Sequence, residues 1–223
     1  MAIWVKICGV KTAEALDAAL DARADLVGFV FFPPSPRHLD LNLARALASR
    51  VGDRAGIVAL TVDADDRLLA DIVETVRPML LQLHGHETPE RLAAIKARFA
   101  LPVMKALAIE TRADLDRIKA YAGAADRLLF DAHPPRAATR PGGLGRPFDW
   151  TLLQGLDPGR PFIVSGGLDA ENVAEALRIT RAQGVDVSSG VERAPGDKDP
   201  AKIRAFIEAA HAAAERERKP EPA

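Results

Sequence analysis

The sequence is poor in cysteine, with Cys8 the only one among 223 residues. A single thiol cannot form a disulfide within the chain, and such sparse cysteine usage is typical of a reducing compartment, so we expect a cytoplasmic protein. Cys8 is therefore either a small core residue or a thiol with a chemical role.

Long apolar runs and an excess of one charge are also missing. No run approaches the roughly 18 residues of a membrane-spanning helix, and the start "MAIWVKICGV" lacks the pattern of a signal peptide. Lys and Arg together number 30 and Asp and Glu 31, and neither sign forms a block. We therefore expect a small-molecule partner rather than nucleic acid or a membrane surface.

What the sequence does contain is a series of short apolar runs rich in β-branched and aromatic residues. They are nearly continuous rather than alternating, which is typical of parallel strands covered on both faces. The eight runs span residues 3–7, 26–32, 56–62, 79–83, 101–107, 127–131, 161–165 and 185–189.

Helical patterns fill the gaps between these runs. Thr88-Pro89 and Asp199-Pro200 are typical helix starts, because a capping oxygen accepts from first-turn amides and proline needs no partner there. Strict alternation of strand and helix leaves an open doubly wound sheet or a closed barrel. Eight evenly spaced units favour the barrel, and "CGVKTA" lacks the glycines of a dinucleotide-binding turn.

We therefore predict a single α/β domain with the (β/α)8 TIM-barrel fold over residues 1–213, followed by a solvated tail over 214–223. The sixth unit is irregular because residues 132–147 intervene before a short helix near 148–153. A loop of that length within a compact domain is usually functional or disordered.

Glycines and serines follow the last two runs. Gly166 and Gly167 come after the seventh run, and Ser189 and Gly190 end the eighth. In this fold the active site lies at the carboxyl ends of the strands, and the last two loops commonly bind phosphate through backbone amides. The pattern predicts a phosphorylated substrate, although glycine pairs also serve as simple tight turns.

Two further strand ends carry groups suited to proton transfer. Cys8 ends the first run and lies near Lys6 and Lys11, and a thiol needs nearby positive charge to act as a base. Asp131 ends the sixth run, where a carboxylate is costly unless it is solvated, paired or used in chemistry. Facing each other across a barrel mouth, the two would form the acid and base of an isomerase.

Two other segments carry candidate binding groups. Arg37, in a proline-stiffened loop, is either a surface arginine or a fork for a substrate carboxylate. "HGHE" places His84 and His86 two residues apart with Glu87 next, but no third ligand has suitable local spacing for zinc. We expect no metal, with His84 either contacting the substrate or serving the structure.

Six of these segments, in order, resemble one family. They are "VKICGVK", "GFVFFPPSPRHLD", "LQLHG", "LLFDA" followed by "GGLGRPFDW", "SGGLDAENV" and "GVDVSSGVERAPGDKD". Together they are similar to phosphoribosylanthranilate isomerase of tryptophan biosynthesis over about residues 3 to 207.

The resemblance implies a cofactor-free enzyme that rearranges N-(5-phosphoribosyl)anthranilate to 1-(2-carboxyphenylamino)-1-deoxyribulose 5-phosphate. It implies that Cys8 is the general base, held as a thiolate near neutral pH, and Asp131 the general acid. It further implies that Arg37 binds the anthranilate carboxylate and Asp186 the ribose hydroxyls. The phosphate would be held by Gly166, Gly167, Ser189 and Gly190. Members occur as monomers and homodimers.

One departure and two alternatives remain. Leu144 stands where the family commonly has threonine, and the preceding loop differs in composition. The sister isomerase of histidine biosynthesis would carry aspartate in place of Cys8 and a half-barrel repeat, which this sequence lacks. A non-catalytic barrel that only binds phosphorylated ligands shares the fold, but it would not need both Cys8 and Asp131.

Overall fold

The computed structural model describes residues 3–133, 142 and 148–218. Leu144 and most of the expected loop at 132–147 lie outside the described residues.

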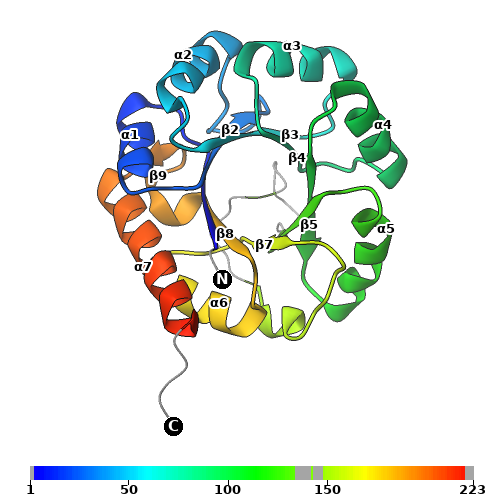
Figure 1. Cartoon of the computed structure of the whole chain (residues 1–223), viewed down its shortest axis with the longest axis vertical. Helices are drawn as coiled ribbons and strands as arrows, with labels where there is room; N and C mark the ends of the chain where they lie inside the picture. The colour runs from blue at the N-terminus through cyan, green and yellow to red at the C-terminus, as the bar shows by residue number, and fades with distance from the viewer. Residues whose placement is uncertain (1–2, 134–141, 143–147, 219–223) are drawn as a thin grey trace.

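Eight parallel strands form a closed barrel in chain order, as predicted (Figure 1). The barrel closes where β1 pairs with β8, with Lys6 opposite Asp186 in the register. The strands are β1 (Trp4–Cys8), β2 (Leu26–Phe31), β3 (Gly56–Thr61), β4 (Leu80–Leu83), β5 (Val103–Ile109), β6 (Arg127–Ala132), β7 (Phe162–Val164) and β8 (Gly184–Val187). All eight predicted runs therefore contain a strand, with ends that differ by a few residues.

Helices surround the barrel and pack against its outer face (Figure 1). The α-helices are α1 (Ala13–Asp21), α2 (Leu41–Val51), α3 (Asp66–Val76), α4 (Pro89–Phe99), α5 (Ile118–Ala122), α6 (Val173–Thr180) and α7 (Pro200–Arg218). A 3-10 helix, η1 (Arg112–Arg117), precedes α5, and η2 (Trp150–Leu153) stands in the sixth unit where the others have an α-helix. The irregular sixth unit thus keeps only a short turn of helix in its described part.

Capping residues fix where several helices begin. Thr12, Asp40, Asp65 and Thr88 each accept a hydrogen bond from the amide three residues on, as a capping side chain does. The predicted starts at Thr88-Pro89 and Asp199-Pro200 are both present, since α4 begins at Pro89 and α7 at Pro200. Helix α7 runs past residue 213 to Arg218.

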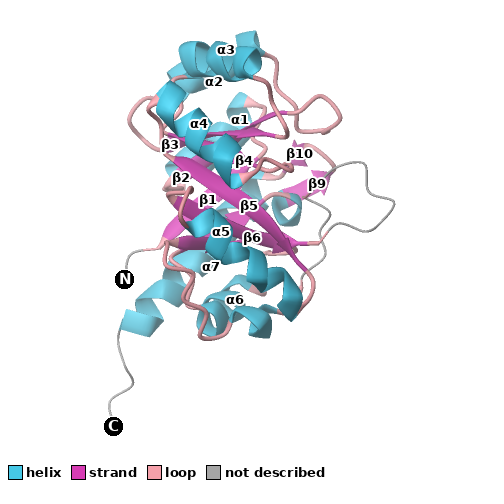
Figure 2. Ribbon diagram, turned by 90° about the vertical axis from the view of Figure 1, so that its right-hand side faces the viewer, coloured by secondary structure: helices cyan, strands magenta, loops and turns pink. Residues whose placement is uncertain are grey.

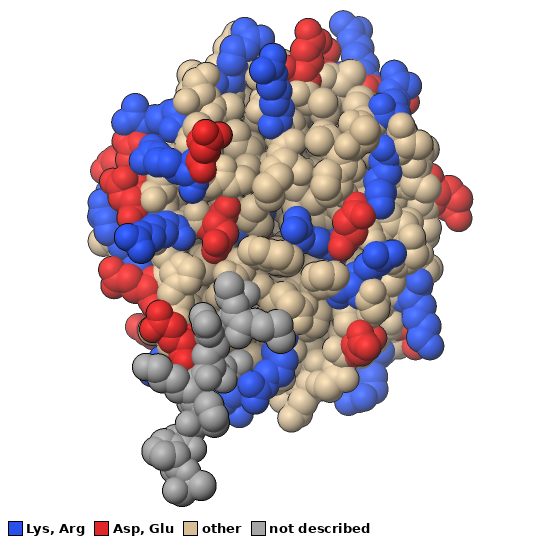
Figure 3. Space-filling model, viewed as in Figure 1, with Lys and Arg blue, Asp and Glu red and all other residues tan. Residues whose placement is uncertain are grey.

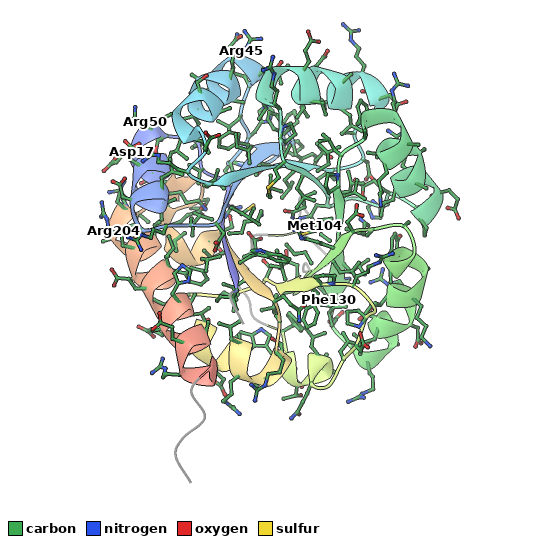
Figure 4. The ribbon with its side chains drawn as sticks, in the orientation of Figure 1. Asp17, Arg45, Arg50, Met104, Phe130 and Arg204 are labelled. Carbon is green, nitrogen blue, oxygen red and sulfur yellow. The ribbon has the colours of Figure 1, made fainter. Side chains whose placement is uncertain are left out.

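The core lies in two layers. The larger layer fills the space between strands and helices, and the smaller one fills the barrel near the strand starts with Leu26, Val58, Leu80, Met104 and Ile163 among others. Figure 4 shows Met104 inside the ring of strands. Higher in the barrel the inner face turns polar, because Lys6, Gln82 and Asp186 are all buried there.

Polar side chains close the end of the barrel where the strands start. The carboxylate of Asp25 accepts from the amide of Val5, that of Asp126 from Val103, and the side-chain oxygen of Gln183 from Phe162. Each residue lies just before one strand and binds the start of the preceding strand. These bonds satisfy amides at the barrel edge that the neighbouring ladder leaves unpaired.

The opposite end carries one element that the sequence did not predict. A 3-10 turn, η3 (Ser189–Val191), follows β8 and leads into a hairpin of β9 (Glu192–Ala194) and β10 (Asp197–Lys198). Figure 2 shows this hairpin at one end of the barrel, outside the ring of helices. It brings Glu192 and Lys198, both buried, to Arg37 in the loop that follows β2.

The surface is mixed in charge. On the face drawn in Figure 3, Lys and Arg side chains alternate with Asp and Glu around the described part of the molecule. Within the residues that the structure describes, no helix has the length and apolar character needed to cross a membrane.

Candidate active site

The carboxyl ends of the strands bring together polar groups from six of the eight units. Cys8 ends β1, Asp131 lies one residue before the end of β6, and Asp186 lies in β8. All three side chains are buried, and Arg37, after β2, is buried as well. His84, directly after β4, is partly exposed, as are the glycines after β7 and Ser189 and Gly190 of η3.

Cys8 lies above a buried ion pair inside the barrel. The Lys6 ammonium donates to Oδ1 of Asp186 at 2.8 Å, and neither residue is more than slightly exposed. The Ser165 hydroxyl donates to Oδ2 of Asp186 at 3.3 Å. Because residues two apart on a strand share a face, Lys6 and Cys8 both point into the barrel.

The thiol differs from the expected near-neutral base. Burial raises the pKa of Cys8 above its ordinary value, because a thiolate loses its hydration there, and the Asp186 charge adds to the rise. The positive charges of Lys6 and Lys198 oppose the shift without cancelling it. In the free protein Cys8 is therefore a thiol at neutral pH, and the thiolate becomes populated as the pH rises.

Asp131 is held among His84 and two glycines. His84 Nε2 lies 3.5 Å from Asp131 Oδ2, and the Ala132 amide donates to Oδ1 at 2.8 Å. A Cβ on Gly142 would overlap Oδ2, and one on Gly166 would lie 2.9 Å from Oδ1. Gly166 also has φ of +85°, so both its backbone and its packing require glycine. Neither of these two glycine positions has room for a side chain against the carboxylate.

A second buried ion pair shapes the turn that carries His84. Lys105, on the outer side of β5, donates to Oε2 of Glu87 at 2.8 Å and to the carbonyl of Gly85 at 2.6 Å. Oε1 of Glu87 accepts from the amide of Asp63 at 3.0 Å. Glu87 therefore joins the turns after β3 and β4 rather than binding metal, and His86 is exposed beside Asp63. Within the described residues no cluster of three or more His, Cys, Asp or Glu could hold a metal ion.

The new hairpin binds Arg37. Glu192 accepts from Nε and Nη2 of Arg37 at 2.7 and 2.8 Å, which is the two-point geometry that an arginine fork favours. Lys198 donates to the same carboxylate at 2.8 Å and to the carbonyl of Ser188. Burial lowers the pKa of Lys198 to about 8, despite the opposing charge of Glu192. Arg37 is thus a buried, oriented group and not a surface arginine.

The two glycine-containing loops meet. Gly167 also has positive φ, at +65°, and its carbonyl accepts from the Asn172 side chain at 2.9 Å. A Cβ on Gly190 would overlap the carbonyl oxygen of Leu168. Gly166, Gly167, Ser189 and Gly190 are therefore brought to one side of the mouth, as the phosphate-site prediction requires.

Sequence reasoning missed the burial of four charged side chains at this end of the barrel, of which it noted only Lys6, as a charge near Cys8. Lys6 and Lys105 each stand inside an otherwise apolar run, and that is the signal that could have identified them. Glu192 and Lys198 left no comparable signal, because their burial depends on a hairpin that returns over the mouth.

The comparisons with known proteins identify the family of this chain. The sequence model of the N-(5′-phosphoribosyl)anthranilate (PRA) isomerase family matches residues 5–209. The chain belongs to the phosphoribosylanthranilate isomerase family. The predicted fold and the predicted family are both confirmed.

Individual relatives place it well inside the family. The phosphoribosylanthranilate isomerase of Rhodopseudomonas palustris (strain BisA53) is 66% identical over 212 residues, covering 95% of this chain and 97% of the relative. That of Nitrobacter hamburgensis is 63% identical over 213 residues, covering 96% and 95%.

Solved structures of the family share the whole barrel. The Thermotoga maritima phosphoribosylanthranilate isomerase has a TM-score of 0.84 at 34% identity, covering 94% of this chain and 99% of that one. Another, with a TM-score of 0.83 at 33% identity and the same coverage, was solved in complex with reduced 1-(o-carboxyphenylamino)-1-deoxyribulose 5-phosphate.

Proposed function

We infer that this chain is an isomerase of tryptophan biosynthesis that converts N-(5-phosphoribosyl)anthranilate to 1-(2-carboxyphenylamino)-1-deoxyribulose 5-phosphate. The observation that carries this function is the pairing of a buried thiol at the end of β1 with a buried carboxyl at the end of β6, in a chain of this family. The ligand of the related complex is the reduced form of the proposed product.

The first step opens the ribose ring. Asp131, as the general acid, gives a proton to the ring oxygen while the anthranilate nitrogen supplies the electron pair that forms the C1=N bond. His84, 3.5 Å from Oδ2, lies where it can hold this carboxyl group in place. The product of the step is a Schiff base with a free hydroxyl at the former ring position.

The second step moves a proton from C2. The thiolate of Cys8 takes this proton, the C–H electron pair forms the C1=C2 bond, and the C1=N electrons return to nitrogen. The resulting enolamine then gains a proton at C1 and loses one from the C2 hydroxyl, which yields the ketone. Such acid and base groups each contribute about 10² to 10⁴-fold.

The remaining residues bind the substrate. Arg37, oriented by Glu192, binds the anthranilate carboxylate, and Asp186 at the inner wall accepts from ribose hydroxyls. Gly166, Gly167, Ser189 and Gly190 hold the phosphate through backbone amides, because Gly190 packs directly against Leu168, the residue after Gly167, and so brings the two loops together. No cofactor enters this scheme, and we expect the barrel at 1–213 to act alone as a monomer or in a homodimer.

The test is the loss of substrate fluorescence with phosphoribosylanthranilate made in the assay, for the wild type, Cys8→Ala and Asp131→Asn. We expect conversion by the wild type and a fall in kcat of at least about 10²-fold in each variant. Urea unfolding of each variant is the control, since neither change should reduce the free energy of unfolding enough to unfold the chain.

Either of two results contradicts the proposal. A wild type that binds phosphosugars but leaves the fluorescence unchanged would leave a binding protein with this fold. Variants that retain full kcat would remove Cys8 and Asp131 from the proposed roles.

A further inference from the structure

The reaction proposed above requires negative charge on a buried sulfur, and the structure places a lysine beside it that this scheme does not use. Lys6 is fully buried, and it precedes Cys8 by two residues on the inner face of β1. Burying an ammonium is costly, and the apolar neighbours of this strand give no packing reason for a lysine. Its position therefore calls for an explanation.

Gly28 of β2 provides the space for both side chains. Gly28 pairs with Cys8 in the register, and a Cβ built on it would lie 3.0 Å from Cys8 Sγ and 3.2 Å from Lys6 Cε. The thiol and the end of the lysine side chain therefore lie over the same glycine. Without a side chain at this point, the ammonium comes close enough to Sγ that each group shifts the pKa of the other.

Lys6 keeps its charge in this setting. Burial alone would lower its pKa, but the charges of Asp186 and Cys8 outweigh burial and raise it. Lys105 is buried with a carboxylate partner too, and there burial lowers the pKa. At Lys105 the charges of Glu87 and Asp63 do not outweigh burial, whereas at Lys6 the charges of Asp186 and Cys8 do.

We propose that Lys6 is a positioning residue that stabilises the thiolate of Cys8, and that Asp186 limits this effect by neutralising part of the lysine charge. This rests on the function proposed above, in which Cys8 is the base. The two members of the ion pair then have opposite effects on the ionisation of Cys8: the charge of Lys6 favours the thiolate, and that of Asp186 opposes it.

The groups facing Cys8 come from several elements. Lys6 lies on its own strand, Asp186 faces it from β8, and Lys198 acts on it from the hairpin. Gly28 faces it from β2, and the Ser188 hydroxyl donates to its carbonyl at 3.2 Å. Of these, Lys6 is the largest influence that favours the thiolate.

The experiment is a titration of thiolate ultraviolet absorbance in the full chain without substrate, from about pH 6 to about pH 11. Cys8 is the only cysteine, so after subtraction of a Cys8→Ala titration the signal belongs to that residue alone. Absorbance also does not require a reagent to reach the buried sulfur.

The proposal predicts shifts of opposite sign for the two members of the pair. Lys6→Met should raise the midpoint by about one pH unit or more, and Asp186→Asn should lower it by a similar amount. The charge-neutral double variant, Lys6→Met with Asp186→Asn, should fall between them. If Lys6→Met alone fails to fold because Asp186 is left unpaired, the midpoint of the double variant is compared with that of Asp186→Asn. These two proteins differ only at residue 6, so a higher midpoint in the double variant shows the effect of Lys6.

Lys105→Met is the matched control, because it also removes a buried, ion-paired lysine but on the outer side of β5. It should leave the Cys8 midpoint unchanged. In kinetics, Lys6→Met should move the pH profile of kcat to higher pH, because the thiolate then forms at higher pH.

Unchanged midpoints, or shifts of the same sign in Lys6→Met and Asp186→Asn, would overturn the proposal and leave the pair a structural role. The titration contains no substrate, so it decides this question even if the wild type proves inactive. An inactive wild type would overturn only the proposed function.

Discussion

The two ends of the barrel bury polar groups in different ways. Where the strands start, Asp25, Asp126 and Gln183 each bind a backbone amide, and the layer behind them is apolar. Where the strands end, buried charges bind one another, as in the pairs of Lys6 with Asp186 and of Arg37 with Glu192.

This contrast predicts that residues at the strand starts contribute mainly to the stability of the fold and residues at the strand ends mainly to catalysis. A side chain that satisfies a backbone amide keeps a strand in place whatever the substrate, so changes at the strand starts should alter unfolding and leave turnover intact. Charges that balance one another set the protonation of reacting groups, so changes at the mouth should alter turnover first.

The largest expected effect lies in the apolar layer. Met104→Ala should lower the free energy of unfolding by about 2 to 5 kcal/mol, because it opens a cavity in a fully buried position. The turnover of the folded fraction should stay near that of the wild type. Urea unfolding and kcat per folded molecule measure both quantities.

Met79→Ala is the control for this change, because Met79 is 45% exposed at the same end. Met79→Ala should lower the free energy of unfolding by less than about 1 kcal/mol. A Met104→Ala protein with normal stability and reduced kcat would contradict the expectation that the strand starts affect stability and the strand ends affect turnover.

A change at the strand ends, beside Asp131, should alter turnover more than stability. Gly166→Ala should lower kcat/KM by about 10²-fold, because the new methyl group would overlap the backbone of Ala132 and lie 2.9 Å from Asp131 Oδ1, so that the carboxylate must shift. Gly159→Ala is the matched control, since Gly159 also has positive φ, at +71°, but has open space around it. Both variants should lose about 1 to 2 kcal/mol of stability through backbone strain, and Gly166→Ala should lose more than Gly159→Ala because its methyl group also overlaps the backbone of Ala132. Equal kcat/KM in the two variants would contradict a role for close packing against Asp131.

The pH profile should report the thiol. Because burial raises the pKa of Cys8 and the base must be deprotonated, kcat/KM should rise with pH, by up to about tenfold per unit below that pKa. Lys198, with a pKa of about 8, loses its positive charge in the same range, which opposes ionisation of Cys8 and makes the rise shallower. A profile that is flat from neutral to alkaline pH would argue against a thiol with a raised pKa as the base.

The smallest expected effect concerns one amide. Asp126→Ala removes the carboxylate that accepts from Val103 and from Lys96, and it should lower the free energy of unfolding by about 1 kcal/mol with kcat unchanged. Asp53→Ala, at an exposed aspartate in the turn after α2, should lower it by less than half as much. Equal losses in the two variants would show that Asp126 acts only as a surface charge.

The sequence predicted the barrel because parallel strands and their caps leave local patterns. Eight apolar runs, Thr88-Pro89 and Asp199-Pro200 are all readable without tertiary information. The same reasoning placed Cys8 and Asp131 at strand ends, where this fold has its active site.

What it could not predict depends on contacts between distant residues. Both faces of a parallel strand are buried, so alternation does not reveal that Lys6 points inward and Lys105 outward. The partner of Arg37 is 155 residues away in the chain, and no local pattern links them. The raised pKa of Cys8 likewise follows from its burial in the assembled barrel and not from the charged residues beside it in the sequence.

The closing contact between β1 and β8 has a consequence for how this protein is made. Lys6 and Asp186 lie 180 residues apart, so at synthesis rates of about 5 to 20 residues per second the first strand waits about 10 to 40 s for its last neighbour. During that time the ammonium of Lys6 has no carboxylate partner and the sulfur of Cys8 has no enclosing wall. The thiol therefore comes into its working environment only after nearly the whole chain has left the ribosome.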